Sequence, residues 1–433
     1  MLRALLVGMM GKAFPLYLSM LSSLAGSLVV AAVLGRAHTT ELAAHALVLA
    51  LLAPMLLAGQ GALQGMMPFV ARAEDDPGTL GEVVRAGTWL SLSLGALFAL
   101  VMAAVPILAR PLGVDGETLA ALGIVYPFLV ALHAFVASLS ASATTLLVAM
   151  GRTRAVLALS LVETVLVLGL APVLVLGAGP VPALGLLGAG IALAACGAVA
   201  LVVKVLVVRR LLPSRARGWI GAPRWRRVGD IARVGLPTGA TLLVKSAALS
   251  VLAVATARIG APEAAAHQFL VLLANLLFFP ALAVGRSSIP AVAAAAEGDP
   301  VAARRVVLAG YVLALPVTLA ALASVWALKG PIVGTLSPDP VVGATMVAVF
   351  PLLCWVAAAD NVQVVSGMGL VALRRTMPSL YVFAFCYGAL VCAAFPLAGL
   401  GGPVLVWAGY AMAVTGLALG QTVALWRATS GRG

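Results

Sequence analysis

The stretch GRAHTTELAAHALVL, residues 35–49, has a counterpart in ARIGAPEAAAHQFLV, residues 257–271. Between the two, an arginine, a glutamate and a histidine keep their places at an offset of 222: Arg36, Glu41 and His45 match Arg258, Glu263 and His267. The offset stays between 222 and 224 over about 160 residues of the chain. A fixed period of self-similarity is the mark of a repeated structural unit. The sequence therefore predicts two homologous halves.

Hydropathy indicates which structural class of protein these halves form. The 433 residues are 63% hydrophobic and 9% charged, with a mean hydropathy of +1.14. An apolar run of 18 or more residues is long enough to cross a bilayer as a helix. We expect an all-α integral membrane protein with twelve such helices, at about 13–34, 42–71, 87–109, 118–149, 155–177, 184–207, 235–257, 264–296, 306–328, 341–372, 378–398 and 403–425.

The repeat and the charges predict the topology. Six helices per half is an even number, so both halves enter the membrane from one side, and a pseudo-two-fold axis along the membrane normal relates them. We expect bundles at 1–208 and 234–433, joined by a basic cytoplasmic linker at 209–233 that lies on anionic headgroups. Twenty-one of the 27 Lys and Arg residues then fall in cytoplasmic loops and tails, so both termini are expected in the cytoplasm.

Several segments carry a resemblance to a known family. They are AFPLYLSMLSSLAGSLVVAAVLGR (13–36), GLPTGATLLVKS (235–246), EAAAHQFLVLLANLLFFPALAVG (263–285), EGDPVAARR (297–305) and VSGMGLVALRRT (365–376). In this order and spacing they resemble the multidrug and toxic compound extrusion (MATE) family over nearly the whole chain. The resemblance implies two six-helix bundles, alternating access, and export driven by a proton or sodium gradient. Members often carry an Asp where this chain has Val30 and a Glu where it has Lys245, whereas Asp360 fits a common carboxylate position.

Charges deep inside apolar spans are expensive and mark functional positions. Lys245 lies ten residues from Gly235, about 15 Å along a helix, so its stem does not reach the interface. Asp360, near the middle of 341–372, is its expected partner, either as a titrating carboxylate or in a static salt bridge. Glu163 is a candidate proton relay or a buried carboxyl, and Arg286 a gate or an inter-helix tie.

Uncharged polar residues inside the spans are weaker candidates. Each has two open interpretations, as a lining of a substrate cavity or as a packing residue hydrogen-bonded in the interior. Gln363 shares a helix face with Asp360 at i+3, whereas Asn361 does not. A lone histidine here is more often an interior hydrogen-bonding residue than a metal ligand. The candidates are Gln60, Gln64, Asn275, His133 and Gln363.

The sequence features bear on three classes of function. A secondary exporter of small amphipathic molecules fits twelve helices, whereas a flippase for lipid-linked saccharides often has fourteen. An intramembrane enzyme requires motifs such as DxxxD, HExxH or GxSxG, and a P-loop would indicate direct use of ATP; the sequence has none of them. We expect a monomeric exporter in the bacterial plasma membrane that binds no cofactor, metal or nucleic acid. Its coupling ion is expected to be the proton, with sodium as the alternative, and its substrates neutral, zwitterionic or anionic.

Overall fold

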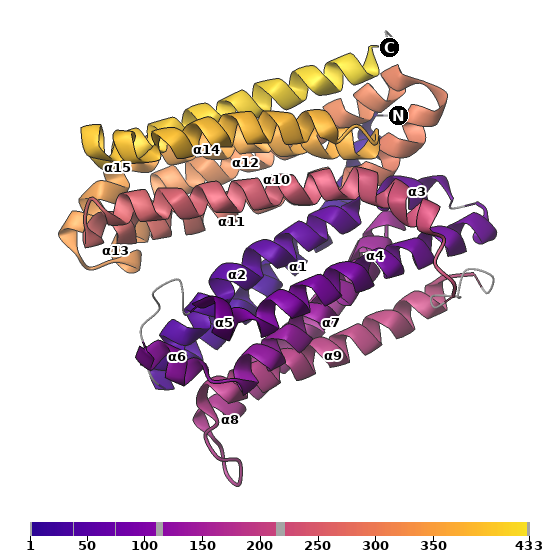
Figure 1. The fold of residues 1–433 in the computed structure, drawn as a ribbon. Helices are drawn as coiled ribbons and strands as arrows, with labels where there is room; N and C mark the ends of the chain where they lie inside the picture. The colour runs from indigo at the N-terminus through magenta and orange to yellow at the C-terminus, as the bar shows by residue number, and fades with distance from the viewer. Residues whose placement is uncertain (1, 38, 74, 110–115, 214–220, 431–433) are drawn as a thin grey trace. The chain divides into compact units, whose positions relative to one another are not determined.

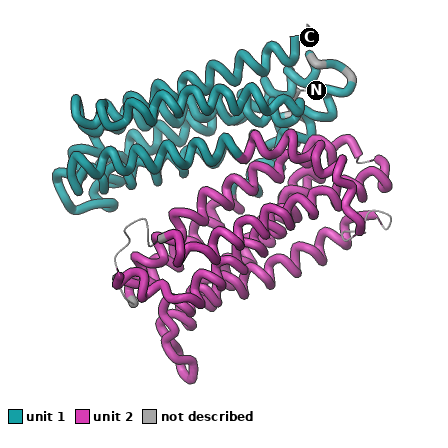
Figure 2. Tube along the Cα trace, viewed as in Figure 1, with its two compact units in different colours: residues 1–17, 240–433 teal, residues 18–239 magenta. Residues whose placement is uncertain are grey.

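The computed structural model describes residues 2–37, 39–73, 75–109, 116–213 and 221–430. These residues form two compact units, Met1–Tyr17 with Ala240–Gly433 (unit 1) and Leu18–Gly239 (unit 2) (Figure 2). All regular elements in the described ranges are α-helices (Figure 1). They are α1 (Leu2–Ala37), α2 (Thr39–Gln64), α3 (Met67–Arg72), α4 (Pro77–Ala103), α5 (Val105–Ala109), α6 (Gly116–Leu122), α7 (Val125–Ala149), α8 (Thr153–Leu176), α9 (Gly185–Leu211), α10 (Trp225–Ala257), α11 (Ala261–Gly298), α12 (Pro300–Ala327), α13 (Lys329–Leu336), α14 (Pro340–Ala372) and α15 (Met377–Thr429).

The described helices confirm the expected membrane spans. Eleven of them are long and apolar enough to cross a bilayer. The longest, α15, has 53 residues and leaves the helical conformation at Gly401 and Gly402, where Gly402 has a φ of +61°. Glycine tolerates this left-handed conformation because it lacks a Cβ atom. The break divides α15 into the two spans expected at 378–398 and 403–425, so the described residues contain twelve spans.

Three of the expected spans are interrupted. The run at 42–71 divides into α2 and α3 at Gly65 and Met66, and the run at 87–109 divides into α4 and α5 at Ala104. The run at 118–149 divides into α6 and α7 near Gly123, whose φ is +57°. Hydropathy does not reveal these breaks, because the residues on both sides are equally apolar. Conversely, α10 begins at Trp225, inside the expected linker, and residues 214–220 of that linker lie outside the described residues.

The repeat is visible in how two matching helices begin. Asp76 caps α4 by accepting a hydrogen bond from the Gly78 amide at 2.9 Å, and Asp299 caps α12 by accepting one from the Val301 amide at 2.8 Å. Each aspartate precedes a proline at the start of the helix. The carboxylate accepts a hydrogen bond from a backbone N–H that has no acceptor within the helix. Proline suits the first helical position because it has no N–H group that would need an acceptor there. The matching Asp-Pro pairs therefore start equivalent helices in the two halves.

Each unit has its own apolar core. In unit 2, α7 packs against α2, α4, α8 and α9 around buried residues such as Leu34, Met102 and Tyr126. In unit 1, α14 packs against α11, α12, α13 and α15. The core of unit 1 is richer in aromatic residues, with Phe350, Phe383, Tyr387, Trp407 and Tyr410 all buried. Polar side chains inside the units must therefore find partners among neighbouring helices.

Candidate functional site

The ion pair expected between Lys245 and Asp360 is present in unit 1. Lys245 on α10 donates from Nζ to Oδ2 of Asp360 on α14 over 2.9 Å. The two side chains are 14% and 5% exposed, so the pair is largely removed from solvent. The ammonium also lies 4.4 Å from the ring centre of Phe278, on α11. Three helices thus meet at this lysine.

The second carboxylate oxygen of Asp360 differs from the first in its hydrogen bonding. Oδ1 is buried and accepts no hydrogen bond from the residues that the structure describes. A buried ion pair is strong only when its remaining lone pairs are also satisfied. The carboxylate therefore has one occupied oxygen and one open acceptor, which is a suitable arrangement for receiving a proton.

The residues next to Asp360 join α14 to other helices. Asn361 points to α12, where its amide donates to the Thr318 hydroxyl and, over 3.2 Å, to the carbonyl of Ala314. Gln363 donates to Oε1 of Gln421 on α15 over 2.9 Å. The prediction that Asn361 leaves the face of Asp360 is consistent with these contacts. Gln363, however, belongs to a separate polar cluster and is not hydrogen-bonded to the ion pair.

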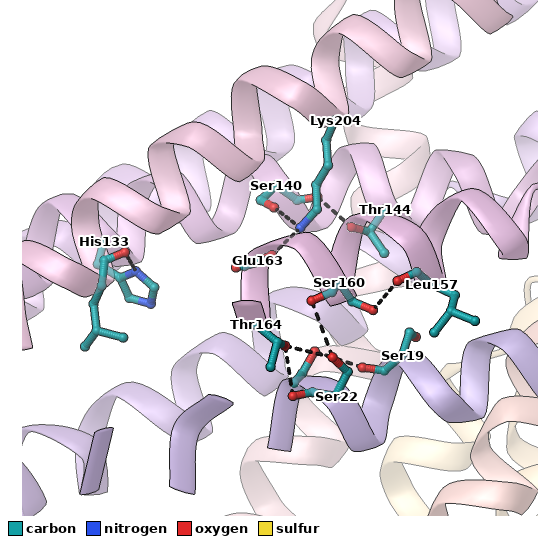
Figure 3. A network of polar contacts seen from close by, with 12 residues as sticks. Ser19, Ser22, His133, Ser140, Thr144, Leu157, Ser160, Glu163, Thr164 and Lys204 are labelled. Atoms are coloured by element: carbon teal, nitrogen blue, oxygen red, sulfur yellow. Dashed lines mark hydrogen bonds and ion pairs between the residues drawn. The ribbon is translucent and has the colours of Figure 1, made fainter. Parts of the chain in front are cut away.

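Unit 2 holds a second ion pair, which sequence reasoning missed (Figure 3). Lys204 on α9 donates to Oε2 of Glu163 on α8 over 2.9 Å and to the hydroxyl of Ser140 on α7 over 2.7 Å. The lysine side chain is 10% exposed and the glutamate 34%. Lys204 lies within the apolar run at 184–207, three residues from its end, so by sequence it resembles a cytoplasmic flanking cation. That position was the available signal.

Hydroxyl groups continue this cluster towards α1. Ser22 and Thr164 are hydrogen-bonded over 2.8 Å, and Thr164 also donates to the backbone carbonyl of Ser22 over 3.0 Å. Figure 3 shows these residues below Glu163, together with Ser19 and Ser160. In contrast, Val30, at the position where related proteins often have an aspartate, is buried in the apolar core of unit 2. The hydroxyl groups of Ser22 and Thr164 thus extend the polar cluster of Glu163 from α8 to α1.

The other candidates are more dispersed. His133 on α7 hydrogen-bonds through Nδ1 to the carbonyl of Leu193 over 3.0 Å, as expected of an interior packing histidine. Gln64 is buried in α2 and Gln60 is half-buried. Asn275 is exposed on α11, and Arg286 is half-buried further along the same helix. His133 also lies close enough to Glu163 to interact with its charge. The roles of all these residues in transport stay predictions.

Comparison with known proteins places this arrangement in a family. The family model MatE matches residues 15–173 and 237–395, which are the two halves of the repeat. A probable multidrug resistance protein NorM from Aromatoleum aromaticum is 29% identical over 404 residues, covering 88% of this chain and 83% of that protein. A probable NorM from Xanthomonas axonopodis is 30% identical over 217 residues, which cover 50% of this chain and 46% of the relative, so this match spans about half of each protein.

The fold agrees with this assignment. A solved structure described as the outward-facing conformation of a multidrug resistance MATE family transporter of the MOP superfamily superposes with a TM-score of 0.88. It is 18% identical in sequence and covers 98% of this chain and 96% of its own. The duplicated family match shows that this multi-pass membrane protein belongs to the MatE family, and its helical fold agrees.

Proposed function

We propose that the protein is a proton-coupled exporter of small amphipathic molecules, working by alternating access in a bacterial plasma membrane with both termini in the cytoplasm. The relatives named as multidrug resistance proteins support the substrate class. The observation that carries the mechanism is the 2.9 Å ion pair between Lys245 and Asp360. No finding favours a flippase.

The pair is proposed as the coupling element because it is a single charge-to-charge contact between two long helices. A proton that binds Asp360 neutralises the carboxylate and removes its attraction for the Lys245 ammonium. Because a buried ion pair and a buried uncompensated cation differ strongly in free energy, protonation changes which packing of α10 against α14 is favoured. Binding or release of one proton is thereby linked to a conformational change.

The charges inside the spans bear on the substrate class. With Lys204 included, the deep charges are three cations, Lys204, Lys245 and Arg286, and two carboxylates, Glu163 and Asp360. Lys204 is the cation that exceeds the balance of the four deep charges named from the sequence. An excess of cations disfavours positively charged substrates, which supports neutral, zwitterionic or anionic ones.

Proteoliposomes with separately imposed proton and sodium gradients test the coupling ion. We expect a proton gradient to drive export without sodium, because lysine replaces an oxygen ligand at position 245 and valine another at position 30. Strict dependence on sodium at fixed pH would refute proton coupling. Efflux of matched anionic and cationic dyes tests the substrate class, and export of the cationic dye alone would contradict it.

A further inference from the structure

The two histidines at matching repeat positions have different surroundings. In unit 2, Nδ1 of His45 lies 2.5 Å from the hydroxyl of Tyr126 and is hydrogen-bonded to it. The repeat, whose offset is 224 in this region, puts Phe350 at the place of Tyr126. Phenylalanine has no hydroxyl, and Nδ1 of His267 is buried with no hydrogen-bond partner among the described residues. Phenylalanine at position 350 thus leaves Nδ1 of His267 without the hydrogen bond that His45 makes to Tyr126.

His267 is the first member of a series of aromatic contacts in unit 1. Its ring meets Trp407 edge-on, with ring centres 5.8 Å apart. Trp407 is 5.6 Å from Tyr410, and Tyr410 is 6.5 Å from Tyr387, again between ring centres. Within the described part of the chain, Nε1 of Trp407 is buried without a partner, and the Tyr387 hydroxyl approaches Tyr410 without a hydrogen bond of good geometry.

The series ends at the ion pair. Tyr387 and Tyr410 both lie close enough to Asp360 to interact with its charge. Oδ1 of Asp360 is the unpaired oxygen described above. Four polar atoms that lack partners among the described residues therefore follow one line of neighbouring side chains, from His267 on α11 through α15 to Asp360 on α14.

Buried polar atoms nearly always have a hydrogen-bond partner, either from protein or from ordered water. The four residues here are at most 3% exposed, so protein atoms cover them in this conformation. Their chemistry nevertheless suits water: the indole donates, the carboxylate accepts, and imidazole and phenol do both. A buried water typically makes two to four such bonds. These atoms are satisfied once the helices loosen enough to admit water.

The fold provides a place for this loosening. Tyr387 lies in the first helix of α15, and Trp407 and Tyr410 in the second, on opposite sides of the break at Gly401 and Gly402. A small movement between these two helical segments separates Tyr387 from Tyr410. Breaks of this kind concentrate conformational change in a few residues.

We propose that unit 1 contains an intermittently hydrated proton path from His267 to Asp360, closed in this conformation; the inference rests on the proposed coupling role of the Lys245–Asp360 pair. A proton taken up at the imidazole of His267 passes through water and the Tyr387 hydroxyl to Oδ1 of Asp360, and each carrier regains a proton from the one before it. Only O–H and N–H bonds form and break. The indole of Trp407 orients the water by donating a hydrogen bond. Lys245 on α10 and Cys386 on α15 are titratable groups beside the path.

Radiolytic hydroxyl-radical labelling tests the hydration independently of transport, because radicals formed from internal water oxidise the side chains next to it. The wild-type protein is labelled in proteoliposomes while a proton gradient and a substrate drive turnover. We expect Trp407 and Tyr387 to be oxidised several-fold faster than Tyr126, which is equally buried and satisfied by His45. Equal, slow labelling of all three side chains would overturn the proposal, whatever ion couples export.

A reciprocal pair of substitutions tests the path itself. Phe350→Tyr restores the phenol that unit 2 has, so it should satisfy His267, lower the labelling of Trp407 and reduce proton-driven efflux, while exchange driven by substrate alone continues. Tyr126→Phe is the matched control in unit 2 and should leave the labelling of Trp407 and the proton coupling unchanged. Unchanged labelling of Trp407 in a folded Phe350→Tyr protein would contradict the path. Loss of efflux under every driving force in the wild type would instead refute the proposed function.

Discussion

The two units each bury a lysine against a carboxylate, but the partners are arranged differently. In unit 2, Lys204 has two oxygen partners, Glu163 and Ser140, and the carboxylate is one-third exposed (Figure 3). In unit 1, Lys245 has the carboxylate of Asp360 and the face of Phe278, and the second oxygen of Asp360 has no partner among the described residues. The pair in unit 2 thus has additional hydrogen-bond partners and access to solvent, whereas the pair in unit 1 is buried with fewer polar partners.

This difference suggests different roles for two similar pairs. A pair with several hydrogen bonds and some access to solvent loses little when one contact changes, so it suits a constant structural link. A buried pair with an open acceptor is sensitive to the arrival of a proton. The comparison therefore supports the proposal that coupling lies in unit 1 and that the pair in unit 2 is a structural link. Substitutions on the two sides can be compared directly.

The largest effect is expected for the pair in unit 1. Lys245→Ala or Asp360→Asn leaves the other side chain buried and unpaired, at a cost of about 3–5 kcal/mol each, whereas the double substitution is nearly neutral. Thermal unfolding of the two single variants and the double variant in detergent forms a double-mutant cycle. If the pair is also the switch, the stable double variant binds substrate but does not couple export to a proton gradient.

Two outcomes would contradict this prediction. Additive losses of stability in the double variant would show that Lys245 and Asp360 do not interact. Normal proton-driven export by a stable double variant would show that the pair is a static link.

A smaller effect is expected for the pair in unit 2. Glu163→Gln removes the charge of the partner, but Lys204 keeps the hydroxyl of Ser140 and the site is partly open to solvent. We expect a loss of about 1–3 kcal/mol in unfolding free energy and no change in the coupling ratio of protons to substrate. A complete loss of proton coupling with stability retained would move the coupling site to unit 2 and reverse the comparison.

The hydroxyl pair beside Glu163 should contribute less. Thr164→Val removes the hydrogen bonds to Ser22 without changing the shape of the side chain, at a cost of about 1 kcal/mol. Thr88→Val is a suitable control, because that hydroxyl bonds to the carbonyl of Val84 in its own helix. Equal shifts in melting temperature for the two variants would show that the link between α1 and α8 adds nothing to stability.

The smallest effect is expected where a unit meets water, at the start of α4. The Thr79 hydroxyl, followed by the amides of Gly78 and Thr79, holds the pKa of the Asp76 carboxyl below its ordinary value of 3.8. The lower pKa in the folded state means that this cap stabilises the helix above pH 3.8, and that its contribution disappears as the pH falls through the folded value. Amide exchange at Thr79 and Leu80, corrected for intrinsic rates, should therefore accelerate in acid.

Asp76→Asn should abolish that acceleration, because asparagine caps a helix without titrating. The start of α8 provides the control, since its N-cap is Arg152 and makes no carboxylate hydrogen bond. Acid-dependent opening of both helix starts to the same extent would assign the effect to general unfolding.

The ion pair in unit 1 shows how far a sequence-based prediction of the site extends. A lysine about 15 Å into an apolar run requires a partner, and Asp360 was the central carboxylate in the same half, so composition and depth were sufficient. The pair in unit 2 was missed because Lys204 lies near the end of its run, where a lysine stem ordinarily reaches water. Only the packing of α7, α8 and α9 shows that its ammonium turns inward to Glu163 and Ser140.

The sequence by itself determined the number of spans, the duplication and the depth of most charges, because these follow from the length of apolar runs and from a constant repeat offset. The tertiary structure decided which polar atoms find partners. His45 and His267 have matching positions in the repeat, yet one is hydrogen-bonded to Tyr126 and the other lies against Trp407. Hydropathy is a property of single segments, whereas hydrogen bonding inside a membrane protein depends on which faces of separate helices meet. That information exists only once the helices have packed.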